Sequence, residues 1–115
     1  MAVYSSNLII KTGTPFEQVF TLEDGVSNSP LNLTNFGIAA QMRKHRGATT
    51  GITTFTTSIY DTTGGKIQIG LSTTQTAALK PGRHVYDVIT TNTSGVMECV
   101  VEGMVLVSQA VTRHG

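Results

Sequence analysis

The sequence predicts an all-β protein in which two antiparallel sheets pack face to face as a sandwich. Apolar and polar residues alternate with period two over several short segments, which is the pattern of half-buried strands. Gly, Asp, Asn and Pro recur between these segments as turn signals. No strand–helix–strand rhythm is found, which disfavours a parallel α/β sheet. A small closed barrel is the alternative arrangement of the same strands.

Length and composition fit one domain with its own core. The chain has 115 residues, of which 39% are hydrophobic, so burial can offset the entropy of the chain. Only 13% are charged and the formal net charge is +1, so the chain as a whole does not attract a polyanion such as nucleic acid. A surface with so little charge resists self-association weakly, which favours a protein that assembles.

The expected strands follow one another with short turns between them. They cover residues 7–11, 16–22, 37–43, 53–60, 66–71, 83–90 and 96–107, with a further short apolar piece at 31–33. That makes about seven strands, the number typical of an immunoglobulin-like sandwich. Residues 108–115 are expected to leave the sheet as an extended tail, so that 1–115 form a single domain.

One short helix is expected before the penultimate strand, where the period of two breaks. Ser72 is a suitable N-cap residue, and Gln75 follows three residues later at the capping-box spacing. Ala77 to Leu79 continue the helical pattern, and Pro81-Gly82 stops it. The expected order is therefore strand, helical turn, sharp corner, strand.

The last expected strand carries apolar residues on both faces. The odd-numbered face, which we assign to the core, holds Met97, Cys99, Val101, Val105 and Val107. Gly103 shares that face, where only a small residue would fit. Val100, Met104 and Leu106 lie opposite, on a face that is usually polar in a sandwich. This second apolar stripe predicts a subunit contact or a covering loop.

Arg83, His84, Tyr86 and Asp87 are the side chains that most resemble a catalytic cluster. On a strand, however, Arg83 and Asp87 face one way while His84 and Tyr86 face the other. His84 and Asp87 therefore cannot pair within this strand. We interpret the segment as a corner whose Tyr86 packs at the end of the sandwich, and we expect no enzyme activity from it.

The one dense basic run is formed by Arg43, Lys44, His45 and Arg46, directly before a Gly/Thr-rich loop. It is either a solvated hairpin tip or a contact for an acidic partner surface. Nucleic-acid binding is disfavoured, because no aromatic residue is interleaved with the basic ones. We keep these four residues as candidate partner contacts, together with Val100, Met104 and Leu106.

No cofactor or metal site is expected from the motifs. His45, His84 and His114 stand apart, and Cys99 has no second ligand at metal-binding spacing, so we interpret it as a small core residue. Nucleophile-elbow and phosphate-loop motifs are missing, and the carboxylates are scattered along the chain. One cysteine allows no internal disulfide. The N-terminal residues do not read as a signal peptide, and no apolar run reaches about 18 residues, so a membrane span is not expected.

Three segments together resemble a known family: PFEQVFTLEDGVSNSPLNLTNFGIAAQMRK, GGKIQIGLSTTQTAALKPGRHVYDV and SGVMECVVEGMVLVSQAVTR. They are similar to the small immunoglobulin-like structural proteins of tailed bacteriophages, including the N-terminal domain of upper baseplate proteins. The resemblance runs from Phe16 to Arg113 and is most specific in the middle segment. His84 departs from it, because a Tyr is more usual there, and the turn after Asp24-Gly25 is longer.

The resemblance implies a non-enzymatic component of the virion: a tail, baseplate or head-surface decoration protein, assembled in the host cytoplasm. Its implied partners are other virion proteins and further copies of itself. The alternative is a β-sandwich module that binds carbohydrate or a host surface. Such sites usually expose aromatic rings, whereas this chain has 6% aromatic residues and no Trp. Tyr4 and Tyr60 are the rings that would be tested first.

Overall fold

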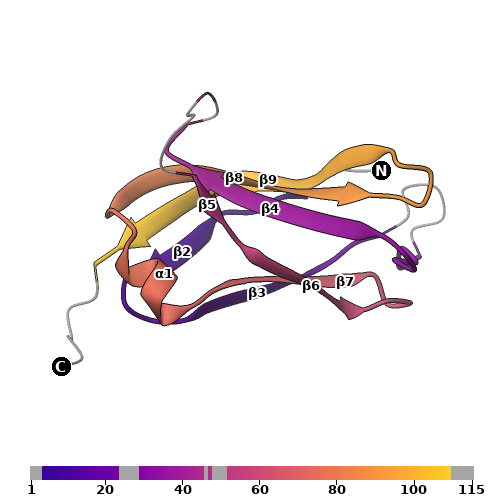
Figure 1. Ribbon diagram of the computed structural model, residues 1–115, viewed down its shortest axis with the longest axis horizontal. Helices are drawn as coiled ribbons and strands as arrows, with labels where there is room; N and C mark the ends of the chain where they lie inside the picture. Colours follow the sequence, from indigo (N-terminus) through magenta and orange to yellow (C-terminus); the bar gives the residue numbers. More distant parts are fainter. Residues whose placement is uncertain (1–3, 24–28, 46, 48–51, 110–115) are drawn as a thin grey trace.

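The structure, a computed structural model, describes residues 4–23, 29–45, 47 and 52–109. These residues form two sheets that lie one above the other, as Figure 1 shows. The predicted all-β sandwich is therefore correct in its coarse form. No strand ladder joins the two sheets among these residues, unlike the strands of a single closed barrel. Single hydrogen bonds do cross between them, such as the one from the Thr57 hydroxyl to the Ile38 carbonyl at 3.1 Å. The chain passes from the larger sheet to the smaller one at Phe55, between β5 (Thr53–Thr54) and β6 (Thr56–Asp61).

The larger sheet has six strands in the order β1-β9-β8-β4-β5, with β2 also pairing with β9. Its strands are β1 (Tyr4–Ser5), β2 (Leu8–Lys11), β4 (Gly37–Arg43), β5 (Thr53–Thr54), β8 (Gly82–Thr91) and β9 (Met97–Ser108). The pairs β4–β8, β8–β9 and β4–β5 are antiparallel. Both β1 and β2 run parallel to β9, so the expectation of a wholly antiparallel sandwich is wrong at this edge.

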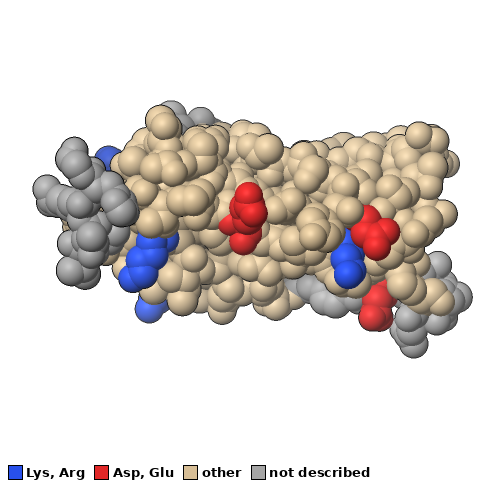
Figure 2. Space-filling view, turned by 90° about the horizontal axis from the view of Figure 1, so that it is seen from below, with Lys and Arg blue, Asp and Glu red and all other residues tan. Residues whose placement is uncertain are grey.

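The smaller sheet has three antiparallel strands in the order β3-β7-β6. They are β3 (Phe16–Thr21), β7 (Lys66–Leu71) and β6 (Thr56–Asp61). Figure 2 views the molecule from the side of this sheet and shows few charged side chains over its middle. Uncharged polar residues such as Thr56, Ser58 and Gln68 line this face, as expected from the charge-poor composition.

The expected strand at residues 53–60 is divided at Phe55. Thr53 and Thr54 pair with β4 in the larger sheet, whereas the chain from Thr56 onward pairs with β7 in the smaller one. Phe55 itself is buried, and its backbone N–H donates to the carbonyl of Ala40 at 3.0 Å. Figure 1 shows the chain crossing from one layer to the other at this point. The crossing closes one side of the sandwich.

The short helix α1 (Thr73–Ala77) forms where it was predicted. The Ser72 hydroxyl accepts from the Gln75 backbone N–H, and the Gln75 side chain accepts from the Ser72 N–H, which completes the capping box. The Thr76 hydroxyl donates to the Thr14 carbonyl at 2.7 Å and so ties the helix to the turn after β2. Gly82 then takes φ +133°, a conformation that suits glycine, and the chain enters β8.

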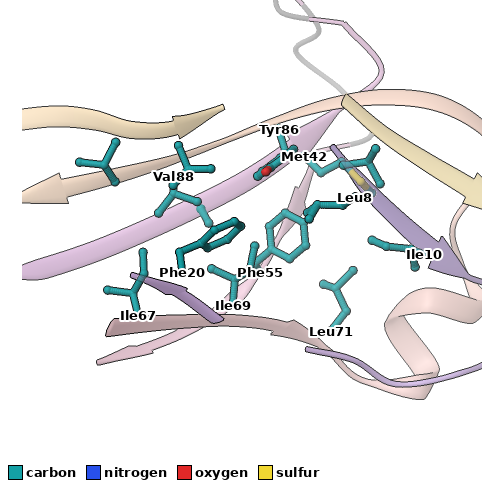
Figure 3. Packing of buried hydrophobic residues seen from close by; sticks show 14 of the residues in the cluster. Leu8, Ile10, Phe20, Met42, Phe55, Ile67, Ile69, Leu71, Tyr86 and Val88 are labelled. Carbon is teal, nitrogen blue, oxygen red and sulfur yellow. The ribbon is translucent and has the colours of Figure 1, made fainter. Parts of the chain in front are cut away.

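The core lies between the two sheets, as Figure 3 shows for a subset of its residues. Phe20, Ile67, Ile69 and Leu71 come from the smaller sheet, and they face residues of the larger sheet that are also buried. Those facing residues are Leu8, Ile10, Ala40, Met42, Tyr86, Val88, Val100, Val101, Val105 and Val107. The short apolar piece expected at 31–33 is not a strand, and Leu33 is fully buried there as part of the core.

Candidate interaction surface

The outer face of the six-stranded sheet is the part of the described surface that gathers exposed apolar side chains from neighbouring strands. Ile9 on β2 is 65% exposed, Met104 on β9 is 47% exposed and Leu106 on β9 is 46% exposed. Ile9 lies directly opposite Leu106 in the pairing of the two strands. Neighbouring Cα atoms across such a pair are about 5 Å apart, so these side chains form one continuous apolar area.

This apolar area extends onto β8 and β4. Met104 lies opposite Val85, and Val85 lies opposite Arg43, so the three residues form a row across the sheet. In the adjacent row, two residues further along β9, Arg83 lies opposite Leu106. Apolar side chains are therefore flanked by two guanidinium groups. We name the set Ile9, Arg43, Arg83, Val85, Met104 and Leu106 the apolar patch.

A polar row follows directly beside the apolar patch. Gln41, Asp87 and Glu102 lie opposite one another across β4, β8 and β9. The Arg43 guanidinium donates to the side-chain oxygen of Gln41 at 3.2 Å. Together with Val85 and Ile89 these residues line a hollow of about 330 Å³ in the outer face. The hollow places two carboxylates next to the apolar patch, so the face carries both signs of charge.

The N-terminal segment fixes the edge of this face. Tyr86 points inward from β8, and its hydroxyl donates to the Ser6 carbonyl at 2.5 Å. The Met104 backbone N–H donates to the Asn7 side-chain oxygen at 3.1 Å. Ser6 and Asn7 thus form the break between β1 and β2. A Cβ on Gly103 would overlap the Ser6 carbonyl, which explains why only glycine fits on that face of β9.

The basic run does not form one site. Arg43 is the last residue of β4 and lies on the outer face, within the apolar patch. Lys44 follows β4 and lines a different pocket at the end of the sandwich that carries α1. His45 is exposed in the following bend. Arg46 lies outside the described residues. The run is therefore divided between a sheet face and a sandwich end.

Val100 does not lie on the outer face, so the expected stripe of Val100, Met104 and Leu106 is wrong in its first member. Val88 pairs with Val101 while Ile89 pairs with Cys99, which leaves Val100 as the extra residue of a β-bulge. The bulge turns Val100 into the core, where it is 0% exposed. Cys99 lies on the other side of the bulge and is only partly buried, so its assignment to the core is also wrong.

The split of the penultimate strand is confirmed. His84, Tyr86, Val88 and Thr90 are buried, and the residues between them lie on the outer side. His84 contacts the carbonyl oxygen of Lys80 through its Nε2 atom at 2.9 Å. Burial raises the pKa of the Tyr86 phenol above its ordinary value. His84 and Asp87 therefore belong to different sides of the sheet.

Sequence reasoning missed Ile9 and the pairing of Asp87 with Glu102. Ile9 belongs to the short strand LIIK, whose sequence does not indicate which strand it pairs with. A bulge-free hairpin would continue the register of Ile89 with Cys99 and would place Asp87 opposite Val101. Asp87 lies opposite Glu102 only because the bulge shifts this register. A turn and its length can be read from sequence, whereas this bulge cannot.

The part of the chain that the structure describes shows neither a metal-binding cluster nor a membrane-spanning helix. There, no group of three or more His, Cys, Asp or Glu side chains is placed to hold a metal ion. No helix among the same residues has the length and apolar character needed to cross a membrane.

The comparisons with known proteins give no family. No protein-family model matches the chain, and no curated protein matches it. Among solved structures, an internalin-like protein of Listeria monocytogenes is similar, with a TM-score of 0.42 and 11% sequence identity. The match covers 94% of this chain and 28% of that chain, so this chain spans less than a third of the length of that protein.

Proposed function

We propose that the chain is a non-enzymatic structural protein that assembles with copies of itself through the outer face of its six-stranded sheet. The observation that carries this proposal is the apolar patch, in which Ile9, Met104 and Leu106 are adjacent and exposed. The outer faces of a sandwich are usually polar, and contiguous exposed apolar area marks an interaction site. Burial against a second subunit would remove these side chains from water.

A second copy is the partner that the charges of this face favour. Guanidinium groups at Arg43 and Arg83 lie beside the apolar residues, and carboxylates at Asp87 and Glu102 lie in the neighbouring row. In a two-fold contact the same patch meets itself, and an axis that runs across the strands would bring the basic side of one subunit against the acidic side of the other. The charge-poor remainder of the surface opposes such association only weakly.

We propose further that the assembly is part of a tailed-bacteriophage virion, as a tail, baseplate or head-surface component made in the host cytoplasm. What supports this is the sequence resemblance, above all in GGKIQIGLSTTQTAALKPGRHVYDV. The same resemblance supports an immunoglobulin-like sandwich. Its middle segment corresponds to β7, the capped helix α1 and β8, which pass from the smaller sheet to the larger one.

The assembly is tested by measuring mass in solution. We expect the wild-type chain to show a concentration-dependent oligomer in analytical ultracentrifugation. The double variant Met104→Asp with Leu106→Asp should be monomeric, because each charge would have to be buried in the contact. The control is Val19→Asp, which puts the same charge on an exposed valine of the smaller sheet and should leave the oligomer intact. A monomeric wild type over the whole concentration range would contradict the proposal.

The virion location is tested separately. Mass spectrometry of purified phage particles from a host that carries this coding sequence should detect the chain at a fixed ratio to the main structural proteins. If the chain is absent from the particles but still forms the oligomer in solution, the proposed virion location is rejected and the proposed self-assembly stands. The two parts of the proposal can therefore fail independently.

A carbohydrate- or host-surface-binding module is the second candidate, and one observation favours it. Tyr60 on β6 is 63% exposed, which leaves its ring free to stack on a sugar. A glycan array that gives a signal with the wild type and none with Tyr60→Ala would support this candidate. An array without a signal would leave assembly as the function.

A further inference from the structure

A second concave site lies at the end of the sandwich that carries α1, away from the apolar patch. It is a pocket of about 430 Å³ between the end of β4, the start of β5 and the segment that joins α1 to β8. We name it the end pocket; the residues used below are Met42, Lys44, Ile52, Leu79, Lys80 and His84. Its volume lies within the range of small-ligand sites.

One part of the end pocket is cationic. Lys44 and Lys80 both line it, from strands and turns that are far apart in sequence. The Lys44 ammonium lies across the start of β8, since a Cβ placed on Gly82 would be 3.4 Å from its Nζ atom. No Asp or Glu is among the described residues that line the pocket. Two lysines therefore line the space, and the described lining contains no carboxylate beside them.

The other part is apolar. Met42 is fully buried and forms the floor, Leu79 packs against the core, and Ile52 is 37% exposed at the rim. His84 is held in the wall by the contact between its Nε2 atom and the Lys80 carbonyl oxygen. The same contact fixes the backbone of Lys80 beside the pocket. The lining thus combines apolar side chains with two lysines.

We propose that the end pocket binds an apolar group that carries a carboxylate. An apolar chain would lie against Met42, Leu79 and Ile52, and the carboxylate would accept hydrogen bonds from the ammonium groups of Lys44 and Lys80. Charge-assisted hydrogen bonds of this kind are short and stronger than neutral ones. A neutral ligand would leave the two charges without a partner, and a small hydrophilic anion would leave the floor in contact with water. A free fatty acid and the apolar C-terminal residue of a peptide share the chemistry that fits.

Binding is tested on the full chain, labelled with ¹⁵N, by following backbone amide signals during titration with sodium octanoate. We expect saturable shifts at residues 42–44, 52–53 and 78–84, and a dissociation constant below about 1 mM. Octan-1-ol has the same chain without the charge, and acetate has the charge without the chain. Each should bind at least about tenfold more weakly, because each loses one of the two kinds of contact.

Two variants locate the charges. Lys44→Gln and Lys80→Gln should each weaken octanoate binding by about tenfold, the loss expected for one hydrogen bond to a charged group. The matched control is Lys66→Gln on β7, in the other sheet, which should bind as the wild type does. The spectra of all three variants also report whether they remain folded. Equal binding of octanol and octanoate, or wild-type affinity in both Lys44→Gln and Lys80→Gln, would overturn the proposal.

A second pair of probes distinguishes a fatty acid from a peptide C-terminus as the source of the carboxylate. Acetyl-Leu-Leu with a free C-terminus and its C-terminal amide differ only in the charge. Displacement of octanoate by the free acid and not by the amide would identify a peptide C-terminus as a competent ligand. Failure of both to displace octanoate would restrict the site to fatty acids. The double variant Met104→Asp with Leu106→Asp alters the outer face of the larger sheet and not the end pocket. Octanoate binding by this variant would show that the end pocket works independently of assembly.

Discussion

The Tyr86 hydroxyl donates a hydrogen bond to the backbone carbonyl of Ser6, 80 residues earlier in the chain. This bond joins the interior of β8 to the break between β1 and β2, and so holds the N-terminal edge against β9. Tyr86→Phe removes the donor and keeps the ring in the core. We expect the free energy of unfolding to fall by about 1 kcal/mol. Urea denaturation measures it, and Tyr60→Phe at the exposed ring should change it by less than about 0.5 kcal/mol.

The same phenol predicts a loss of stability at high pH. Burial raises the pKa of Tyr86 in the folded chain, while in the unfolded chain it keeps its ordinary value of 10.0. The unfolded state therefore releases this proton first, and stability present below pH 10 is lost as the pH rises toward the folded pKa. Unfolding free energies measured between pH 8 and about 11 should fall more steeply for the wild type than for Tyr86→Phe. Parallel curves would contradict the prediction.

A glycine on β9 is required by the close approach of the N-terminal segment. A Cβ on Gly103 would overlap the Ser6 carbonyl oxygen, which is backbone and cannot rotate away. Gly103→Ala should therefore lower the free energy of unfolding by about 1 to 3 kcal/mol, as overpacking does elsewhere. Gly37→Ala is the control, because a Cβ there would meet only the Thr91 side chain at an ordinary 3.7 Å. Thermal denaturation of both variants measures the difference.

The β-bulge of β9 leads to a further prediction, which distinguishes a Val100 buried in the core from a Val100 exposed on the outer face. Val100 is buried and Met104 is exposed, although both have even numbers on one strand. Val100→Ala should cost about 1 to 3 kcal/mol, because it leaves a cavity in the core. Met104→Ala, measured on the dilute monomer, should cost less than about 0.5 kcal/mol. Equal costs would mean that the alternation runs without a break and that the bulge is wrong.

Local chemistry explains which parts of the fold could be predicted. The alternation of Ile67, Ile69 and Leu71 and the capping box of Ser72 with Gln75 depend on residues that are close in sequence, and the structure has both. The faces of β8 follow from the same alternation. The parallel pairing of Leu8 with Val105 depends on residues 97 positions apart, and periodicity contains no information about strand direction.

The candidate surface was predictable only in part, for a related reason. Met104 and Leu106 were expected on an outer face because they follow the bulge in unbroken alternation. Val100 was misplaced because an extra residue in a strand reverses every face before it. The same shift brings Asp87 opposite Glu102, a pairing that needs the three-dimensional register. The face on which a side chain lies could thus be predicted within one strand, whereas the register of pairing between strands could not.

The pairing of Asp87 with Glu102 predicts a stabilising variant within the interaction surface. Like charges directly opposite on neighbouring strands destabilise a sheet, by about 0.2 to 1 kcal/mol for a typical pair. Asp87→Asn keeps the shape and removes one charge, so the free energy of unfolding of the monomer should rise by that amount at neutral pH. Salt screens such a repulsion, so the gain should shrink when the ionic strength is raised to about 1 M.

Glu17→Gln is the matched control for this variant. Glu17 lies opposite Gly70 in the smaller sheet, where its charge faces no carboxylate across the pair. Removing that charge should leave the free energy of unfolding within about 0.5 kcal/mol of the wild type. If assembly uses the acidic row against the guanidinium groups of a second copy, Asp87→Asn should also weaken the oligomer while it stabilises the monomer. A variant that stabilised both would show that the acidic row lies outside the contact.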